Sequence, residues 1–317
     1  MMTPSSNQKK LAAQLFSQAE ERQRFLEALT SPVPQPPALI WRTSRPPNVP
    51  FPIERPFAWQ PRFVDRVAFE FRPGRHPLHA EGAYYCLDIS SVFTGCVLSA
   101  VPTGPSVVID VCASPGGKSM FLWRMLSPSL VVANEVIGKR SAALIANLQR
   151  CRIGPAMVIR ADVSRLAEWI PACADLVVVD APCSGQSLAA RDKLCPGGFH
   201  PATINQNANR QRRILAQAAR LVAPGGYLAY LTCTYALKEN ETNVAWLLKK
   251  QAEFLPRAVP LLAAFQSRLA DFPCYRLWPQ QNMGAGGFAA LLQKDSSGRR
   301  TGISPDRLQT IWTSPDF

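Results

Sequence analysis

Two cysteines lie at the ends of β-branched runs of the sequence, where predicted strands end and side chains can meet a ligand. Asp180-Ala-Pro-Cys183 comes after the run DLVVVD, and Thr232-Cys233-Thr ends the run YLAYLTC. A thiolate is a strong nucleophile when its pKa is lowered, and the cation of Lys118 could lower it. The alternative role of a small buried residue fits Cys183 and Cys233 poorly, because both lie at the tips of predicted strands rather than inside them. It fits the other cysteines better: Cys86, Cys96, Cys151, Cys173 and Cys274.

A glycine-bearing turn follows another such run, in the segment Asp110-Val-Cys-Ala-Ser-Pro-Gly-Gly-Lys118-Ser. Gly116 and Gly117 let the backbone approach a ligand closely, and their amides open a helix. A phosphate-binding P-loop is excluded because it needs glycine where Cys112 stands, and the dinucleotide pattern GxGxxG is absent. The shorter turn suits a cofactor without a pyrophosphate, such as S-adenosylmethionine. An ordinary strand–helix turn explains the local sequence equally well.

Acidic residues follow the next two predicted strands. Glu135 could accept hydrogen bonds from ribose hydroxyls, and Asp162 could meet an adenine amino group. Either residue alone is more often a loop or capping residue. Together with the glycine turn, at three successive strand ends, they outline an adenosine pocket.

Other chemistries of cysteine fit the sequence less well. The nine cysteines form no CxxC pair, which argues against a zinc module or a redox motif. Cys183, Cys195 and His200 have poor spacing for a metal, so no metal is expected. A Cys–His protease is disfavoured because no histidine has a clear orienting partner. A disulfide scaffold is improbable at this length, so we expect a reducing, cytoplasmic environment.

Composition sets outer bounds on the function. The chain has 317 residues, 47% of them hydrophobic, and no apolar run approaches the length of a membrane span. Its start is charged and lacks the apolar core of a signal peptide. The formal charge is +13, which suits a polyanionic partner such as nucleic acid, although simple solubility is the alternative.

The pattern after residue 105 predicts the element order of an α/β protein. Strands are expected at 107–111, 130–134, 156–162, 175–180, 227–233, 272–278 and 287–293. Helices are expected after the glycine turn through residue 126, and near 138–150, 208–222 (ending at Pro-Gly-Gly) and 241–250. This alternation is typical of a doubly wound, mostly parallel, seven-stranded Rossmann-like sheet, which binds ligands at the carboxyl ends of its strands.

The chain is expected to divide into five parts. Residues 1–30 hold an N-terminal helix, with helical periodicity over 9–29. Residues 31–61 contain ten prolines and form an extended strap, whose aromatic side chains are expected to dock on the body. Residues 62–104 form a small N-terminal module, 105–295 the catalytic domain, and 296–317 a loosely ordered tail.

These motifs, in this order, resemble the RsmB/RsmF/NSUN family of RNA 5-methylcytosine methyltransferases. The resemblance covers roughly residues 80–295 and includes QRRIL at 211–215, PGG at 224–226 and Glu239-Asn240-Glu241. It implies the S-adenosylmethionine-dependent methyltransferase fold and an RNA substrate, ribosomal RNA or a ribosomal subunit.

The resemblance also implies roles for individual residues. Cys233 would be the nucleophile that adds to cytosine C6, and Cys183 the base that removes the C5 proton and releases the product. Lys118 and Asp180 would be the polar groups around the base. The cofactor pocket would be lined by Cys112, Ala113, Ser114, Pro115, Gly116, Gly117, Lys118, Glu135, Asp162 and Asp180. Basic residues that could hold the RNA backbone, each equally well a solvated charge, are Arg140, Arg191, Lys193, Arg210, Arg212 and Arg213.

Three positions depart from the family pattern. Leu87 replaces a glutamine, Gln280 a histidine, and Gly286 an acidic residue that is common there. These departures bear on the choice of target more than on the reaction.

Three other functions were compared with the motifs. A DNA cytosine methyltransferase would pair Pro-Cys with Glu-Asn-Val, which is missing. An N-methyltransferase would carry Asn/Asp-Pro-Pro-aromatic at the fourth strand, where this chain has Ala181-Pro182-Cys183. The rival from another class is a non-catalytic RNA-binding or ribosome-assembly factor that kept the fold.

Overall fold

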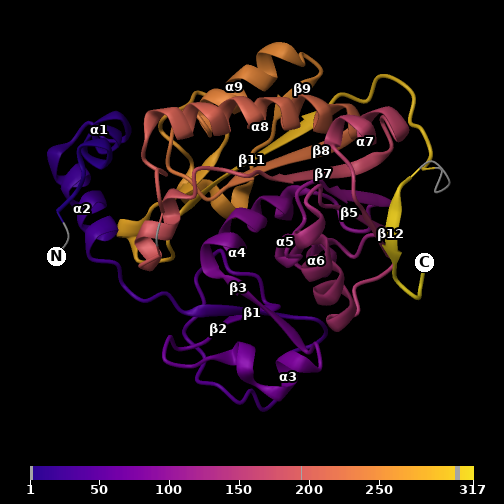
Figure 1. Cartoon of the computed structure of the whole chain (residues 1–317), viewed down its shortest axis with the longest axis horizontal. Coiled ribbons are helices and arrows are strands. Elements are labelled where there is room, and N and C mark those ends of the chain that lie inside the picture. The colour runs from indigo at the N-terminus through magenta and orange to yellow at the C-terminus, as the bar shows by residue number, and fades with distance from the viewer. Residues whose placement is uncertain (1–2, 194, 304–307) are drawn as a thin grey trace.

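A mostly parallel sheet forms the centre of the protein. The computed structural model describes residues 3–193, 195–303 and 308–317. Within these ranges the sheet has nine strands, in the order β10-β11-β8-β7-β4-β5-β6-β12, with β9 paired to β11 (Figure 1). Its strands are β4 (Val107–Asp110), β5 (Leu130–Asn134), β6 (Ala156–Ile159), β7 (Ala174–Asp180), β8 (Val222–Thr232), β9 (Phe254–Pro256), β10 (Tyr275–Leu277), β11 (Gly287–Lys294) and β12 (Thr310–Thr313).

The five central strands run parallel, whereas β9 to β12 pair antiparallel at the two sides. Successive residues of a strand point to opposite faces, and here both faces are buried. In β7, for example, Leu176 and Val178 enter one core cluster, and Val177 and Val179 enter the other. This explains the uninterrupted apolar runs in the sequence.

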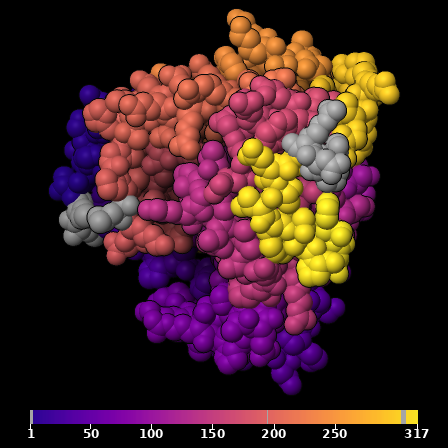
Figure 2. Space-filling view, turned by 45° about the vertical axis from the view of Figure 1, so that its right-hand side comes forward, coloured from indigo at the N-terminus to yellow at the C-terminus, as the bar shows by residue number. Residues whose placement is uncertain are grey.

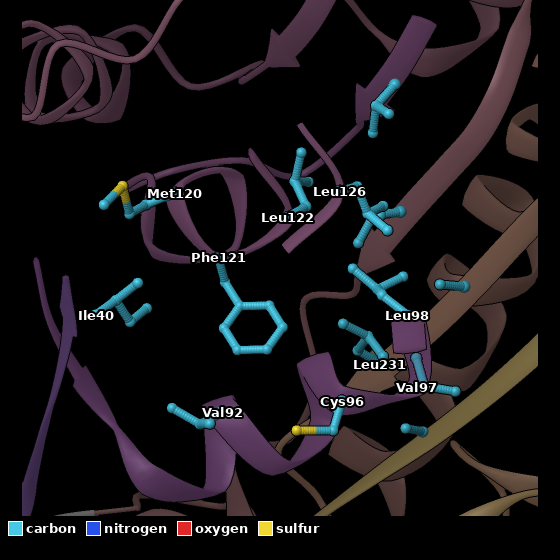
Figure 3. Packing of buried hydrophobic residues seen from close by; sticks show 14 of the residues in the cluster. Ile40, Val92, Cys96, Val97, Leu98, Met120, Phe121, Leu122, Leu126 and Leu231 are labelled. Atoms are coloured by element: carbon cyan, nitrogen blue, oxygen red, sulfur yellow. The ribbon is translucent and has the colours of Figure 1, made fainter. Parts of the chain in front are cut away.

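Helices cover both faces of the sheet. The helices α4 (Ile89–Gly95), α5 (Gly117–Leu126) and α6 (Gly138–Arg150) pack on one face, and α7 (Val163–Trp169), α8 (Pro201–Leu221) and α9 (Glu241–Lys250) pack on the other. Figure 3 shows the Phe121 side chain of α5 pointing toward Val92 of α4. A Cβ atom at Gly95 would lie 2.7 Å from the Phe121 ring, so glycine there permits this close packing.

The N-terminal part has two units. The helices α1 (Ser6–Leu15) and α2 (Ala19–Thr30) pack in one apolar cluster with Tyr235 and Ala285, and β1 (Pro37–Trp41), β2 (Val64–Arg66) and β3 (Tyr84–Asp88) form a separate antiparallel sheet. The short helix α3 (Pro77–Ala80) lies beside that small sheet. Short 3₁₀ helices complete the described structure: η1 (Pro73–Arg75), η2 (Cys96–Ala100), η3 (Gln186–Arg191), η4 (Pro260–Phe265) and η5 (Pro279–Gln281).

Two N-terminal expectations need correction. The single helix expected over 9–29 is broken because Phe16 leaves the helical conformation and packs against Phe25 and Trp278. The strap is not separate from the small module expected at 62–104, because its residues Pro37–Trp41 pair with β2 and β3 of that module in one sheet. Its aromatic residues Trp41 and Trp59 are buried against the chain itself, as expected.

The helix expected over 208–222 begins earlier, at Pro201, whose ring suits the first turn of a helix. The Pro-Gly-Gly segment lies within β8 rather than beyond a helix stop. Val222 already pairs with Ala174, and a register shift before the Tyr227–Leu176 pair accommodates the segment.

The tail expected to be loosely ordered contributes β12, which pairs with β6 and brings the sheet to nine strands. Figure 2 shows this C-terminal segment lying across the flank of the sheet domain. The Ser314 hydroxyl accepts a hydrogen bond from the Ala156 amide at 2.9 Å, which anchors the segment to the start of β6. No helix among the described residues is long and apolar enough to cross a membrane.

Candidate active site

The two cysteines meet at the carboxyl ends of neighbouring strands. Cys183 follows β7 and Cys233 follows β8, and their sulfur atoms lie 3.1 Å apart. Cys233 is exposed, whereas Cys183 is partly buried. The chain order β4, β5, β6 runs one way from the centre and β7, β8 the other, so these strand ends border the position where open α/β sheets bind ligands.

The contact between the thiols polarises them in opposite directions. The Cys183 thiol donates a hydrogen bond to Cys233, which raises the pKa of Cys183, and burial raises it further. The same hydrogen bond stabilises the Cys233 thiolate and lowers its pKa, and Lys118 acts in the same direction. Cys233 is therefore the more acidic thiol of the pair, and Cys183 the less acidic one.

This asymmetry predicts selective alkylation. Iodoacetamide should label Cys233 before Cys183 at neutral pH, because the thiolate is the reacting form. In Cys183→Ala the donor is lost, so the pH midpoint for labelling Cys233 should rise. Peptide mapping across a pH series measures both effects. Labelling of Cys183 first, or an unchanged midpoint in the variant, would contradict the assignment.

Lys118 and Asp180 form an ion pair beside the thiols. Lys118 Nζ lies 3.1 Å from Asp180 Oδ2, and the lysine is buried whereas the aspartate is about one-third exposed. Both charges act on the pKa of Cys233. The structure thus brings together the four residues that the sequence nominated for catalysis.

Asp110, at the end of β4, was not among the nominated site residues. It is fully buried, and burial raises its pKa to about 7. Ser119 donates to its Oδ2 atom at 2.7 Å, while Oδ1 has no hydrogen-bond partner among the described residues. A buried carboxyl oxygen without a partner points to a group that the site still has to accept.

A cavity of about 670 Å³ opens beyond β4, β5 and β6, within the size range of small-molecule sites. Cys112, Glu135 and Asp162 line it. The other nominated cofactor residues, 113–118 and Asp180, are not on its wall. Lys118 and Asp180 lie toward Cys233 instead, where their charges act on its pKa.

The strand ends at this cavity are held by polar side chains. Asn134 donates to the Val111 and Ala161 carbonyls and accepts from the Ala161 amide, which ties three strands together. Glu135 is buried and accepts from the Ile137 amide at 2.8 Å. Asp162 caps α7, and its hydrogen bonds from Ser164 lower its pKa. This role of Asn134 could not be predicted from the sequence, because its hydrogen-bond partners are distant in the chain.

The nominated basic residues do not form one free surface. Arg140 donates to the Ser114 carbonyl and lies 3.4 Å from Glu135, so it stabilises the glycine-bearing turn. Arg191 is paired with Asp88 at 3.4 Å, and Lys193 is exposed. The remaining three, Arg210, Arg212 and Arg213 of α8, line the cavity.

The three departures from the family pattern have different surroundings. Leu87 packs against Gly117, where a Cβ atom would lie 2.7 Å from its side chain. Gln280 leaves a buried carbonyl oxygen without a partner among the described residues. Gly286 has a φ of +95°, and a Cβ atom would lie 2.7 Å from the Tyr235 ring and 2.8 Å from the Leu277 carbonyl. An acidic side chain could not occupy this conformation without a local rearrangement.

Known proteins are similar to this chain in sequence. The ribosomal RNA small subunit methyltransferase F of Psychromonas ingrahamii is 30% identical over 228 residues, which are 70% of this chain and 47% of that protein. The enzyme of the same name from Escherichia coli O9:H4 is 31% identical over 220 residues, 68% of this chain and 46% of that protein. The chain thus spans about half the length of the curated relatives it matches.

Solved structures show the same fold. A methyltransferase homolog protein from Pyrococcus horikoshii gives a TM-score of 0.71 at 21% identity and covers 92% of this chain and 99% of its own. NSun6 from Pyrococcus horikoshii, solved with SFG, gives 0.72 at 19% identity and covers 93% and 99%. The family described as 16S rRNA methyltransferase RsmB/F matches residues 98–293, which is more than half of the sequence. The chain therefore belongs to the 16S rRNA methyltransferase RsmB/F family.

Proposed function

We propose that the protein is an S-adenosylmethionine-dependent RNA cytosine-C5 methyltransferase that acts on ribosomal RNA. The observation that carries this proposal is the pair of thiols, 3.1 Å apart with pKa values moved in opposite directions, beside the ion pair of Lys118 and Asp180. A reaction that needs one nucleophilic thiolate and one basic sulfur has both here.

The residues around the cavity fit S-adenosylmethionine. Glu135 can accept hydrogen bonds from the ribose hydroxyls, and Asp162 lies at the next strand end for the adenine. When bound, this cofactor supplies an electrophilic methyl group on a sulfonium.

Cytosine C5 is a poor nucleophile, and Cys233 would correct this. Its thiolate adds to C6 of the base, a bond forms between sulfur and C6, and the ring electrons make C5 enamine-like. C5 then accepts the methyl group. The lowered pKa of Cys233 provides the thiolate needed for this addition.

Cys183 would complete the reaction. After methylation, C5 carries both the methyl group and its original proton. Once Cys233 is bonded to C6 it no longer accepts the hydrogen bond from Cys183, and the Cys183 thiol would then lose its proton to solvent. The resulting Cys183 thiolate removes the C5 proton, the electron pair re-forms the C5–C6 double bond, and the Cys233 thiolate leaves C6. The raised pKa of Cys183 makes its thiolate a strong base.

Asp180 would hold the N3/N4 edge of the cytosine and stabilise charge that develops on the ring, with Lys118 fixing the carboxylate. The target base must leave its stack to reach the thiols. The net charge of +13 supports a polyanionic substrate. Nine free cysteines among the described residues suit the reducing cytoplasm where ribosomes are assembled.

Methyl transfer to defined RNA tests this function. The full chain is incubated with S-adenosylmethionine and either naked 16S rRNA or small ribosomal subunits, and the RNA is digested and analysed by mass spectrometry. We expect 5-methylcytidine with at least one substrate, and none with Cys233→Ala. Binding of S-adenosylmethionine without transfer to either would favour the alternative, a non-catalytic ribosome-assembly factor.

A further inference from the structure

The segments that carry the two thiols meet at a buried carboxylate that the proposed reaction does not use. Glu239 lies in the turn before α9 and is fully buried. Its Oε2 atom accepts hydrogen bonds from the Ser184 amide at 3.0 Å and from Gln211 Nε2 at 2.8 Å. Its Oε1 atom accepts from the Ser184 hydroxyl at 2.5 Å.

The second thiol segment joins the same group. The Thr234 hydroxyl lies 2.7 Å from that of Ser184 and 3.5 Å from Glu239 Oε1. Ser184 directly follows Cys183, and Thr234 directly follows Cys233. One carboxylate therefore contacts the next residue after each cysteine.

Neighbouring side chains hold the residues on the other side of each cysteine. Gln211 donates to the Pro182 carbonyl at 3.0 Å, so it fixes the residue before Cys183. Asn240 accepts from the Thr232 hydroxyl at 2.6 Å and donates to the Thr234 carbonyl at 2.9 Å, so it brackets Cys233. The Tyr230 hydroxyl donates to the Glu239 carbonyl at 2.6 Å and fixes the turn on β8.

We propose that Glu239 is a positioning residue that sets the separation of the Cys183 and Cys233 sulfur atoms. The loops beyond the two strands share a backbone hydrogen bond from the Ser187 amide to the Cys233 carbonyl at 3.1 Å, and side-chain bonds between the loops add to it in fixing their spacing. Hydrogen bonds to a buried carboxylate are stronger than those between neutral groups. Glu239 is the group that bonds to the thiol loops from β7 and β8 at once.

The geometry predicts different behaviour for two substitutions. In Glu239→Gln, the amide oxygen can accept from Ser184 N–H and Gln211, and the amide nitrogen can donate to a hydroxyl, so the contacts survive without the charge. In Glu239→Ala the donors lose their acceptor and the carboxylate no longer joins the two loops, which keep the contact between the Ser184 and Thr234 hydroxyls and the Ser187–Cys233 backbone hydrogen bond. The first variant should keep the sulfur separation, and the second should not.

Phenylarsine oxide provides the readout, because its arsenic atom bonds two thiols only when they are close together. All proteins carry Cys195→Ala, since Cys195 donates to the Ser184 carbonyl at 3.4 Å and is a third thiol near the pair. We expect Glu239→Ala to bind the arsenical at least about 10-fold more weakly, and Glu239→Gln to bind within about 3-fold of the parent. Cys183→Ala defines the signal without a thiol pair.

Glu241→Ala is the matched control. Glu241 is nearly as buried and begins the same helix, but it bonds Arg276 and Ser267 rather than the neighbours of the cysteines. Loss of a buried carboxylate should lower the melting temperature of both alanine variants. Only Glu239→Ala should also weaken arsenical binding and raise the pH midpoint for Cys233 alkylation. Equal losses in both would show general loosening and overturn the inference.

A folded Glu239→Ala that binds the arsenical like its parent would also overturn it. If that variant does not fold, Ser184→Ala with Thr234→Val removes both hydroxyls and keeps the carboxylate, and the same loss of binding is expected. Unchanged binding in this pair contradicts the inference. The functional meaning of the spacing rests on the proposed reaction, but the titration uses neither RNA nor cofactor. Failure of methyl transfer alone would therefore leave the positioning role standing.

Discussion

Cys183→Ala is expected to accumulate a covalent complex with RNA in the presence of S-adenosylmethionine. The Cys233 thiolate can still add to C6 and C5 can still be methylated, but the C5 proton cannot leave without the second sulfur. The Cys233–C6 bond then persists through denaturation. The complex should appear as a retarded band in a denaturing gel, and sequencing of the trapped RNA would identify the target.

The companion variants give this prediction its controls. Cys233→Ala should form no complex and lose methyl transfer by at least about 10,000-fold, because the nucleophile is gone. Cys183→Ala/Cys233→Ala should also form none. Cys195→Ala, which removes a nearby thiol outside the pair, should behave as the parent. A complex that persists without Cys233 would contradict the assigned roles.

Asp180→Asn is expected to lower kcat by about 100- to 1,000-fold. The substitution keeps the shape of the side chain but removes the charge that holds the cytosine edge and pairs with Lys118 at 3.1 Å. The affinity for S-adenosylmethionine should change little, because Asp180 is not on the wall of the large cavity. Single-turnover methyl transfer and cofactor titration separate these two effects.

Asp175→Asn is the matched control for this substitution. Asp175 lies at the other end of the same strand, where it pairs with Arg300 away from the thiols. It should keep nearly full activity even if stability falls. Equal losses of kcat in the two variants would mean that β7 responds to charge removal in general, and the proposed role of Asp180 would be wrong.

Much of the fold was predictable because the central strands carry local signals. The runs at β4, β5 and β7 are apolar on both faces, as a covered parallel sheet requires. The edge strand β12 was not predictable, since the hydrogen bonds that stabilise it come from β6, about 150 residues away. The break after Leu15 was missed for the same reason: Phe16 leaves the helix to reach Trp278, which lies far along the chain.

The site was likewise predictable only in part. Cys183, Cys233, Lys118 and Asp180 stand out as residue types at the ends of strands, and the structure brings them together. The contacts that tune them were not predicted. Gln211 and Glu239 belong to stretches that match the family, but only the fold brings Gln211 against Glu239 and the Pro182 carbonyl. Likewise, the arginines of α8 suggested an RNA surface, but their side chains line the cavity.

The release of the proton on cytosine C5 is the most direct test of the two-thiol mechanism. RNA labelled with tritium at C5 of cytosine is incubated with the enzyme and S-adenosylmethionine, and released tritium is compared with methyl groups transferred. We expect one tritium to be released for each methyl group transferred, and we expect Cys233→Ala to lose both tritium release and methyl transfer. Methyl transfer without tritium release would place the methyl group elsewhere on the RNA and would contradict the two-thiol mechanism.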